Sequence, residues 1–319
     1  MKKNLFGKII GTAGAGIALF TSAGVYVVTK FYFKLAFERP KKPSGEDNRL
    51  TEQEKKYEPR RQADSAWFRA LSSGEVECKS FDGLTLKAHY IEAPNAVRTI
   101  ILVHGWHGFW DREFASETKW LYENGCNMVA IEQRGHGNSE GKYVTFGLYE
   151  RFDIVSWAKW LNENKNPQNV YLYGKSMGAS TVLMAGSDKD LPDNIRGIIE
   201  DCGYSDPYAE IVYVGSKSGL AEHPFCDFLN AMVKKKIKIS LKDYSPLQAV
   251  RKYTLPLLIF HGKGDKFVPA YMANEIYNAC ASEKKLVLID EAEHCLSFLL
   301  DKDTYTKELL ELFKNDCAS

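Results

Sequence analysis

The sequence predicts an α/β fold with a mostly parallel, eight-stranded sheet and helices on both of its faces. Two observations support this prediction: apolar runs rich in β-branched residues recur along the chain, and segments of helix length separate them. Runs that are apolar throughout indicate strands buried on both faces. Six such runs are Thr99–His104, Asn127–Glu132, Asn169–Tyr173, Gly197–Asp201, Leu257–His261 and Leu286–Asp290. The segments of helix length include Glu113–Asn124, Leu148–Glu163, Ala270–Ala281 and Thr304–Lys314.

Two more strands and an insertion complete the predicted domain. Glu75–Phe81 and Leu84–Ala93 flank Asp82–Gly83, a strong hairpin signal, so they are expected to form an antiparallel edge of the sheet. The stretch Tyr204–Ser245 lies between two strands and has about 40 residues, whereas such connections usually have about 2–6. It predicts a small helical cap inserted after the sixth strand.

The N-terminal segment predicts a transmembrane helix. From Ile9 to Thr29 the chain has 21 consecutive uncharged residues, bounded by Lys8 and Lys30. As a helix this segment spans about 32 Å, which matches the hydrocarbon core of a bilayer. We expect residues 1–35 to be an uncleaved membrane anchor, with a cleaved signal peptide or a buried helix as alternatives. Because lysines flank both ends, the side of the cell membrane that the globular part occupies stays open, the extracellular side included.

Residues 36–73 are predicted to be a charged linker that ends in a short helix. The stretch 38–62 has many charges of both signs and few aliphatic residues, so it cannot bury a core. From about Pro59 to Leu71, a short helix is expected to place Trp67 and Phe68 on the globular domain. That domain is predicted to occupy residues 74–319 and to include the cap.

Composition excludes several functional classes. Lys and Arg number 42 and Asp and Glu number 41, so the net charge is +1 and no basic field holds a nucleic acid. The seven cysteines are scattered without a C-x-x-C motif, which argues against a disulfide framework or a structural zinc site. No metal or cofactor motif is present, and the oligomeric state stays open.

The sequence Gly174-Lys175-Ser176-Met177-Gly178 fits the motif G-x-S-x-G. The predicted strand NVYLY precedes it, and the small residues AST that follow favour the start of a helix. This arrangement is typical of a nucleophile elbow, in which a serine sits on a sharp strand-to-helix turn between glycines. Gly-Lys-Ser also suggests a phosphate-binding loop, but that motif needs glycine where this chain has Asn169.

A nucleophilic serine needs an imidazole to accept its proton and a carboxylate to orient that imidazole. Asp265 follows the strand LLIFHG, and His294 follows the last strand, so loops can return both to Ser176. The order Ser176, Asp265, His294 predicts a catalytic triad. Asp201 is the alternative acid, whereas Asp290 is too close to His294 in sequence.

The transition state of acyl transfer also needs two backbone N–H donors for its oxyanion. Met177 follows the nucleophile, and Trp106 lies in the loop HGWHG after the strand TIILVH, so we predict these two residues as the oxyanion hole. Phe109 and Trp110 follow this loop and are predicted to line the acyl side of the substrate cleft, with core packing as an equal alternative.

From about Gly74 to its C-terminus, the chain resembles the α/β-hydrolase superfamily, in particular its membrane-anchored or cell-surface members in Gram-positive bacteria. The resemblance rests on HGWHG, RGHGNSEG, GKSMGAST, IIEDCGYSD, HGKGDKFVP and AEH. It implies the α/β-hydrolase fold, a Ser-His-Asp triad and no cofactor. One departure is Glu132, where such proteins usually carry Asp, and it bears on the packing of a loop.

These observations predict a serine hydrolase that cleaves carboxylic esters or thioesters through an acyl-enzyme. The alternatives are a serine exopeptidase or amidase with the same triad, and a membrane-displayed binding protein with an idle triad. The expected partners are a small acyl ester, a thioester or a short peptide as substrate, and a membrane at the N-terminal helix. No nucleic acid is expected to bind.

Overall fold

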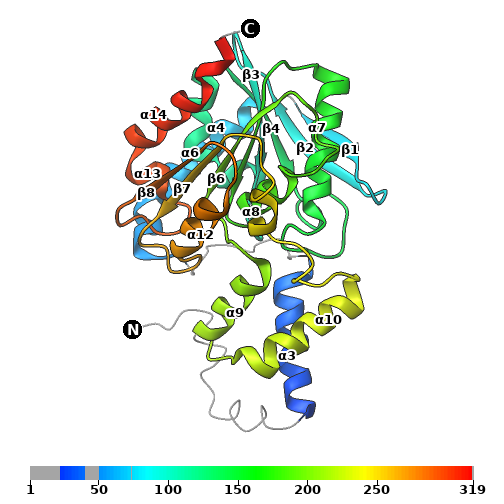
Figure 1. The fold of residues 1–319 in the computed structure, drawn as a ribbon. Coiled ribbons are helices and arrows are strands. Elements are labelled where there is room, and N and C mark those ends of the chain that lie inside the picture. Colours follow the sequence, from blue (N-terminus) through cyan, green and yellow to red (C-terminus); the bar gives the residue numbers. More distant parts are fainter. Residues whose placement is uncertain (1–21, 40–49, 73, 318–319) are drawn as a thin grey trace.

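The computed structural model describes residues 22–39, 50–72 and 74–317 (Figure 1). One sheet has eight strands in the order β1-β2-β4-β3-β5-β6-β7-β8. The strands are β1 (Glu75–Lys79), β2 (Thr85–Ile91), β3 (Arg98–Val103), β4 (Cys126–Glu132), β5 (Val170–Lys175), β6 (Ile195–Asp201), β7 (Leu257–Gly262) and β8 (Lys284–Ile289). The pairs β1–β2 and β2–β4 are antiparallel and the other pairs are parallel. The sheet is therefore mixed, with its antiparallel part at the predicted hairpin.

Strand β3 shows how the sequence fills both faces of the sheet. All six of its residues are buried, and its apolar side chains alternate between two clusters. Ile101 and Val103 contribute to one cluster, and Ile100 and Leu102 contribute to the other, because successive side chains of a strand point to opposite faces. Burying a side chain of this size contributes about 1.5–3 kcal/mol.

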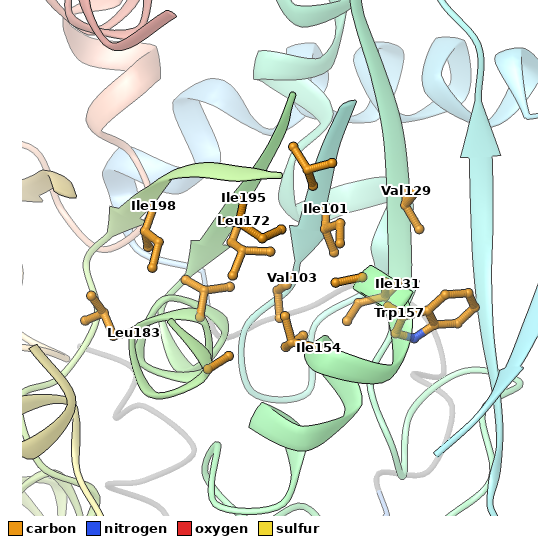
Figure 2. Close-up of a cluster of buried hydrophobic side chains, with 14 of the residues drawn as sticks. Ile101, Val103, Val129, Ile131, Ile154, Trp157, Leu172, Leu183, Ile195 and Ile198 are labelled. Carbon is orange, nitrogen blue, oxygen red and sulfur yellow. The ribbon is translucent and has the colours of Figure 1, made fainter. Parts of the chain in front are cut away.

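Helices cover each face through these clusters. The first face carries α7 (Glu150–Lys165), α8 (Met177–Ala185), α11 (Pro246–Val250) and α12 (Tyr271–Ala279). Figure 2 shows Ile154 and Trp157 of α7 against Val103 and Ile131 of the sheet. The second face carries α4 (Glu52–Leu71), α6 (Ala115–Glu123) and α14 (Lys302–Leu312). The short elements α5 (Trp110–Glu113), α13 (Ser297–Leu300) and η2 (Phe313–Cys317) adjoin these helices.

The predicted cap after the sixth strand is present and consists of α9 (Pro207–Lys217), η1 (Glu222–Cys226) and α10 (Asp227–Ile237). The side chain of Asp206 accepts hydrogen bonds from two N–H groups of α9 and so fixes the start of that helix. A further helix, α3 (Ser22–Phe37), packs on α10 and joins the core of the cap (Figure 1). Phe33 and Phe37 of α3 are completely buried there.

The N-terminal prediction needs a correction in its second half. Residues 22–35, assigned above to a membrane anchor, form most of α3 and bury Thr29 and Phe33. An apolar helix that covers a cap and one that crosses a bilayer have similar composition, which explains the difference. No helix within the described ranges is long and apolar enough to cross a membrane. Ile9 and the other residues of the predicted span up to residue 21 lie outside those ranges, and there the anchor stays a prediction.

Helix α4 is longer than the helix predicted from Pro59 to Leu71. It begins at Glu52, where the side chains of Thr51 and Glu54 form a capping box, and Pro59 lies inside it. Phe68 is buried against the second face of the sheet, as predicted. Much of the predicted linker is therefore a capped helix.

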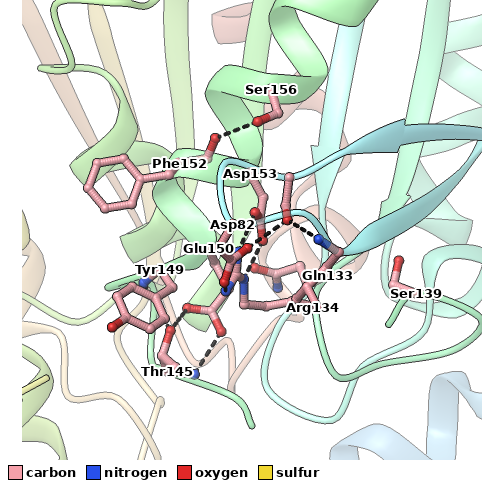
Figure 3. Close-up of polar contacts among 12 residues, drawn as sticks. Asp82, Gln133, Arg134, Ser139, Thr145, Tyr149, Glu150, Phe152, Asp153 and Ser156 are labelled. Carbon is pink, nitrogen blue, oxygen red and sulfur yellow. Dashed lines mark hydrogen bonds and ion pairs between the residues drawn. The ribbon is translucent and has the colours of Figure 1, made fainter. Parts of the chain in front are cut away.

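An ionic network with a buried centre, Arg134 and Asp153, holds the loop after β4 against α7 (Figure 3). The guanidinium of Arg134 donates to both carboxylate oxygens of Asp153, at 2.6 and 2.7 Å, and to both of Asp82, at 3.0 Å. The side chain of Glu150 accepts from the backbone N–H of Thr145 at 2.7 Å and from its hydroxyl. These bonds fix the loop after β4. It lies next to the histidine-rich loop that follows β3, residues 104–108, because His136 accepts a hydrogen bond from the backbone N–H of His107.

Candidate active site

Ser176 lies at the sharp turn between β5 and α8, as the G-x-S-x-G motif predicts. Its φ and ψ are 53° and −123°, a backbone conformation that non-glycine residues rarely adopt. A Cβ atom on Gly178 would lie 1.9 Å from the carbonyl oxygen of Val103, and one on Gly174 would lie 2.2 Å from the carbonyl oxygen of Gly178. Glycine is required at both positions because the chain has no space for a side chain.

The structure brings Ser176, His294 and Asp265 together in one chain of hydrogen bonds. Nε2 of His294 lies 2.9 Å from Oγ of Ser176, and Nδ1 of His294 lies 2.6 Å from Oδ2 of Asp265. The serine follows β5, the aspartate follows β7 and the histidine follows β8. The carboxyl ends of these parallel strands meet at one edge of the sheet, which is why residues distant in sequence become neighbours.

Asp265 and His294 stabilise each other's charged form, which favours the imidazolium that forms when the ring takes a proton. Oδ1 of Asp265 accepts hydrogen bonds from the backbone N–H groups of Phe267 and Val268, at 2.8 and 2.9 Å. Burial opposes ionisation of this carboxyl, but His294 and these bonds hold its pKa below the ordinary value. Burial likewise opposes protonation of His294, but Asp265 raises its pKa well above the ordinary value.

The alternative acids and the motif's lysine lie elsewhere. Asp201 accepts hydrogen bonds from Ser297 and Tyr305, at 3.2 and 3.0 Å, and makes none with His294. Asp290 is exposed and pairs with Lys263. Lys175 is buried and pairs with Glu117 at 2.5 Å, which gives the lysine of the motif a structural ion pair.

The predicted oxyanion donors lie on two sides of the serine. Met177 begins α8 directly after Ser176. Trp106 lies in the loop after β3, where a Cβ atom on Gly105 would be 3.0 Å from Cβ of Ser176. Its indole Nε1 donates to the carbonyl oxygen of Ala36 in α3, at 2.9 Å. In the described part of the chain, the backbone N–H groups of Met177 and Trp106 donate no hydrogen bond to the protein.

Ser176 opens onto an apolar pocket between the sheet and the cap. The pocket holds about 710 Å³ of empty space, part of it continuous with solvent. Three parts of the chain enclose it: α3, the cap, and the loops at the carboxyl ends of the strands. Its lining consists of Tyr32, Leu35, Ala36, Trp106, Phe146, Ser176, Met177, Tyr204, Glu210, Ile211, Val214, Gly215, Phe225, Leu229, Phe267 and Val268.

The prediction that Phe109 and Trp110 line the cleft is wrong for this pocket. The ring of Trp110 stacks on His89 with a centroid distance of 3.7 Å, and its edge meets Phe68 of α4. Phe109 lies in a separate depression beside Arg69 of α4. After the histidine-rich loop the chain turns toward the second face of the sheet, which directs both aromatic side chains away from the serine.

Glu210 of α9 is a pocket residue that sequence reasoning missed. Its side chain is 3% exposed, and neither carboxyl oxygen has a hydrogen-bond partner in the described structure. Burial raises the pKa of Glu210 to about 8, although the charge of His294 lowers it. The signal in the sequence is weak because one glutamate in an amphipathic cap helix normally faces solvent.

Replacing Glu210 with glutamine should increase stability at alkaline pH. The folded-state pKa of Glu210 is about 8 and the ordinary value is 4.5. Below about pH 4.5 the carboxyl is neutral in the folded and the unfolded state, so its ionisation does not lower stability there. As the pH rises from about 4.5 toward 8, the carboxyl ionises only in the unfolded state, and the free energy of unfolding falls by up to about 1.4 kcal/mol per pH unit. Urea unfolding at several pH values should show the advantage of Glu210→Gln growing between pH 5 and 8 and then levelling. If the free energies of unfolding of the two proteins changed with pH in parallel, the prediction would be wrong. Glu222→Gln, at an exposed position of the cap, is the control.

The fold and the elbow identify the class of protein: the chain has the α/β-hydrolase fold. A family model described as serine aminopeptidase, S33 matches residues 94–204. An esterase from Pyrococcus furiosus, Pf2001, superposes with a TM-score of 0.63 and 21% identity, over 85% of this chain and 96% of that one. The family match and the esterase fold support a hydrolase.

Two curated relatives show how far the sequence similarity extends. Protein YqkD of Bacillus subtilis is 25% identical over 239 residues, which are 73% of this chain and 76% of that protein. The lysophosphatidylserine lipase ABHD12 of Danio rerio is 24% identical over 182 residues. The second match covers 53% of this chain and 43% of the lipase, so less than half of that protein is compared.

Proposed function

We propose that this protein is a serine hydrolase that cleaves carboxylic esters with a hydrophobic acyl group. The observation that carries the proposal is the hydrogen-bonded series Ser176–His294–Asp265, which opens onto an apolar pocket. A histidine that accepts a hydrogen bond from a serine hydroxyl removes its proton during attack, and a buried carboxylate fixes the tautomer of the ring.

The proposed reaction has two steps. Oγ of Ser176 attacks the acyl carbon while Nε2 of His294 takes the hydroxyl proton, and the ring then gives this proton to the departing alcohol. Water then hydrolyses the resulting acyl-enzyme. His294 takes a proton from the water molecule and returns it to Oγ of Ser176. The backbone N–H groups of Trp106 and Met177 bind the oxyanion in both steps, because such donors contribute most when they are already in place.

The lining of the pocket supports an acyl chain as the group that is bound. Ile211, Val214 and Leu229 of the cap, with Leu35 of α3, enclose it with aliphatic side chains. Transfer of each methylene group from water to such a site contributes about 0.8 kcal/mol. The relatives support this class of substrate, since one is an esterase and another is a lysophosphatidylserine lipase.

Cleavage of an aminoacyl amide is a second candidate, and one observation favours it. Glu210 offers an unpaired carboxyl inside an otherwise apolar pocket, where it can bind the cationic amine of such a substrate. An amine bound there would also relieve the cost of burying the charged carboxylate. The matched family model, described as serine aminopeptidase, agrees with this candidate.

One experiment separates the two candidates. The full chain is assayed with p-nitrophenyl esters of increasing acyl length and with the matching aminoacyl arylamides. The proposal predicts that kcat/KM rises with acyl length by about threefold to fourfold per added methylene until the pocket is filled. In the variant Val214→Trp, which narrows the pocket, the rise should stop at shorter esters. Hydrolysis of arylamides alone, lost in Glu210→Gln, would favour the second candidate instead.

A further inference from the structure

Two cysteines that the proposed mechanism does not use lie beside the triad. Cys202 follows β6, and Cys295 follows His294, so 93 positions separate them in the sequence. Their sulfur atoms are nevertheless 3.4 Å apart. Cys202 is fully buried and Cys295 is half-buried, and both are free thiols. This distance is longer than a disulfide bond of about 2.05 Å, so the two sulfur atoms are in contact but not bonded.

The surroundings of Cys295 favour the thiolate. The thiol of Cys202 donates to its sulfur, and the charges of His294 and Lys175 act in the same direction. Together they lower the pKa of Cys295 against the effect of burial. On its other side, Oε1 of Glu113 lies 3.6 Å from the sulfur and accepts a hydrogen bond from the thiol form of Cys295. Burial raises the pKa of Cys202 well above the ordinary value, so this residue keeps its proton. A thiolate beside a protonated thiol is the arrangement found in redox-active pairs.

Other cysteines of the described chain lack this arrangement. Burial raises the pKa of Cys126 and of Cys226 to about 11, and it also raises that of Cys78. Cys280 lies near the hydroxyl of Ser282, at 3.4 Å. The structure therefore distinguishes one reactive pair from ordinary buried thiols.

We propose that Cys202 and Cys295 are an oxidative modification site, which a peroxide converts to a disulfide bond. The thiolate of Cys295 attacks one peroxide oxygen, the O–O bond breaks, and Cys295 becomes a sulfenic acid as hydroxide leaves. The sulfur of Cys202 then attacks the sulfenic sulfur, an S–S bond forms, and the hydroxyl group leaves as water with the thiol proton. The two cysteines lose two electrons, and the peroxide accepts them.

The bond would disturb the triad because Cys295 is the direct neighbour of His294. The two sulfur atoms must approach each other by roughly 1.3 Å, from 3.4 Å to the length of a disulfide. The backbone N–H of Cys202 donates to the carbonyl oxygen of Phe260 in β7, at 2.9 Å, which ties Cys202 to the sheet, so we expect the displacement in the loop that carries Cys295 and His294. A displacement of about 1 Å at a catalytic group lowers the rate by about 100-fold. The oxidised protein should therefore be a hydrolase with turnover reduced by about 10–100-fold.

The test treats the full chain with hydrogen peroxide, in the presence of a chelator, and follows it by intact mass and peptide mapping. The expected result is a loss of two hydrogen atoms and a cross-linked peptide pair that contains Cys202 and Cys295, both reversed by dithiothreitol. Cys202→Ser should form no cross-link, whereas the control Cys280→Ser should form it as the wild type does. Two free thiols at these positions after oxidation would overturn the proposal.

A parallel ester assay tests the effect on the triad, and this arm rests on the proposed function. Wild type and Cys280→Ser should lose turnover together with the appearance of the cross-link and regain it in dithiothreitol. A complete cross-link with unchanged turnover would refute control of His294. Formation of the cross-link in a protein that hydrolyses no ester, even when reduced, would contradict the proposed function and leave the modification site standing.

Discussion

Ser176→Ala is expected to lower ester turnover by about 10⁴-fold or more, without loss of the fold. The variant removes the oxygen that forms the acyl-enzyme, and the remaining site accelerates hydrolysis only through binding and the oxyanion donors. Removal of one hydroxyl leaves the close backbone contacts of Gly174 and Gly178 in place, so the structure has no reason to change. Turnover of a p-nitrophenyl ester measures the effect, and circular dichroism and thermal unfolding check the fold.

Ser180→Ala provides the matched control. Ser180 is a buried serine one turn further along α8, and its hydroxyl donates to the carbonyl oxygen of Tyr204 at 2.9 Å. The same hydroxyl accepts a hydrogen bond from the backbone N–H of Tyr204, at 2.8 Å. The control should therefore lose about 1–3 kcal/mol of stability, because a buried N–H is left without its partner, and should keep its turnover. Equal turnover in Ser176→Ala and the wild type would remove Ser176 from the reaction.

Asp265→Asn is expected to lower turnover by about 10³–10⁴-fold. The amide has about the same size as the carboxylate, but its NH₂ group favours the wrong tautomer of His294, and its charge is absent. Asp265 raises the pKa of His294, so the variant ring should lose its proton at a lower pH. The midpoint on the acidic side of the pH profile of kcat/KM should therefore move to lower pH, which a merely structural defect would not produce.

Two further aspartates make this second prediction discriminating. Asp201→Asn changes the alternative acid, which contacts Tyr305 and Ser297 instead of His294. Asp290→Asn changes an exposed residue after β8. Both variants should keep the wild-type midpoint of the pH profile. If Asp201→Asn moved that midpoint and Asp265→Asn did not, the assignment of the acid would be wrong.

The sheet and the three converging residues were accessible from sequence because their signals are local. A buried strand shows as an apolar run, and Ser176, Asp265 and His294 each follow such a run directly. Parallel strands then place these positions at one edge without further information. Gly178 was likewise recognisable, since a tight approach of two backbones requires a residue without a side chain.

Long-range packing could not be obtained in the same way. The sequence of α3 fits a membrane helix and a cap-covering helix equally well, and the burial of Phe33 depends on α10, about 200 positions away. Phe109 and Trp110 follow the predicted oxyanion loop, but the direction of the chain after that loop decides where their rings point. Glu210 is buried because α9 faces the triad, which no periodicity in the cap reveals. The start of α4 is different, because Thr51 and Glu54 form a capping pattern that was readable.

The central claim is that His294 activates Ser176 as a nucleophile, and reaction with a fluorophosphonate followed by peptide mapping tests it most directly. Such a reagent forms a stable adduct with an activated serine and does not need the natural substrate. One phosphonyl group on Ser176 is expected, with the reaction greatly slowed in Asp265→Asn and unaffected in Ser180→Ala. An unlabelled Ser176 in folded protein, under conditions that fully label a known serine hydrolase, would contradict the account.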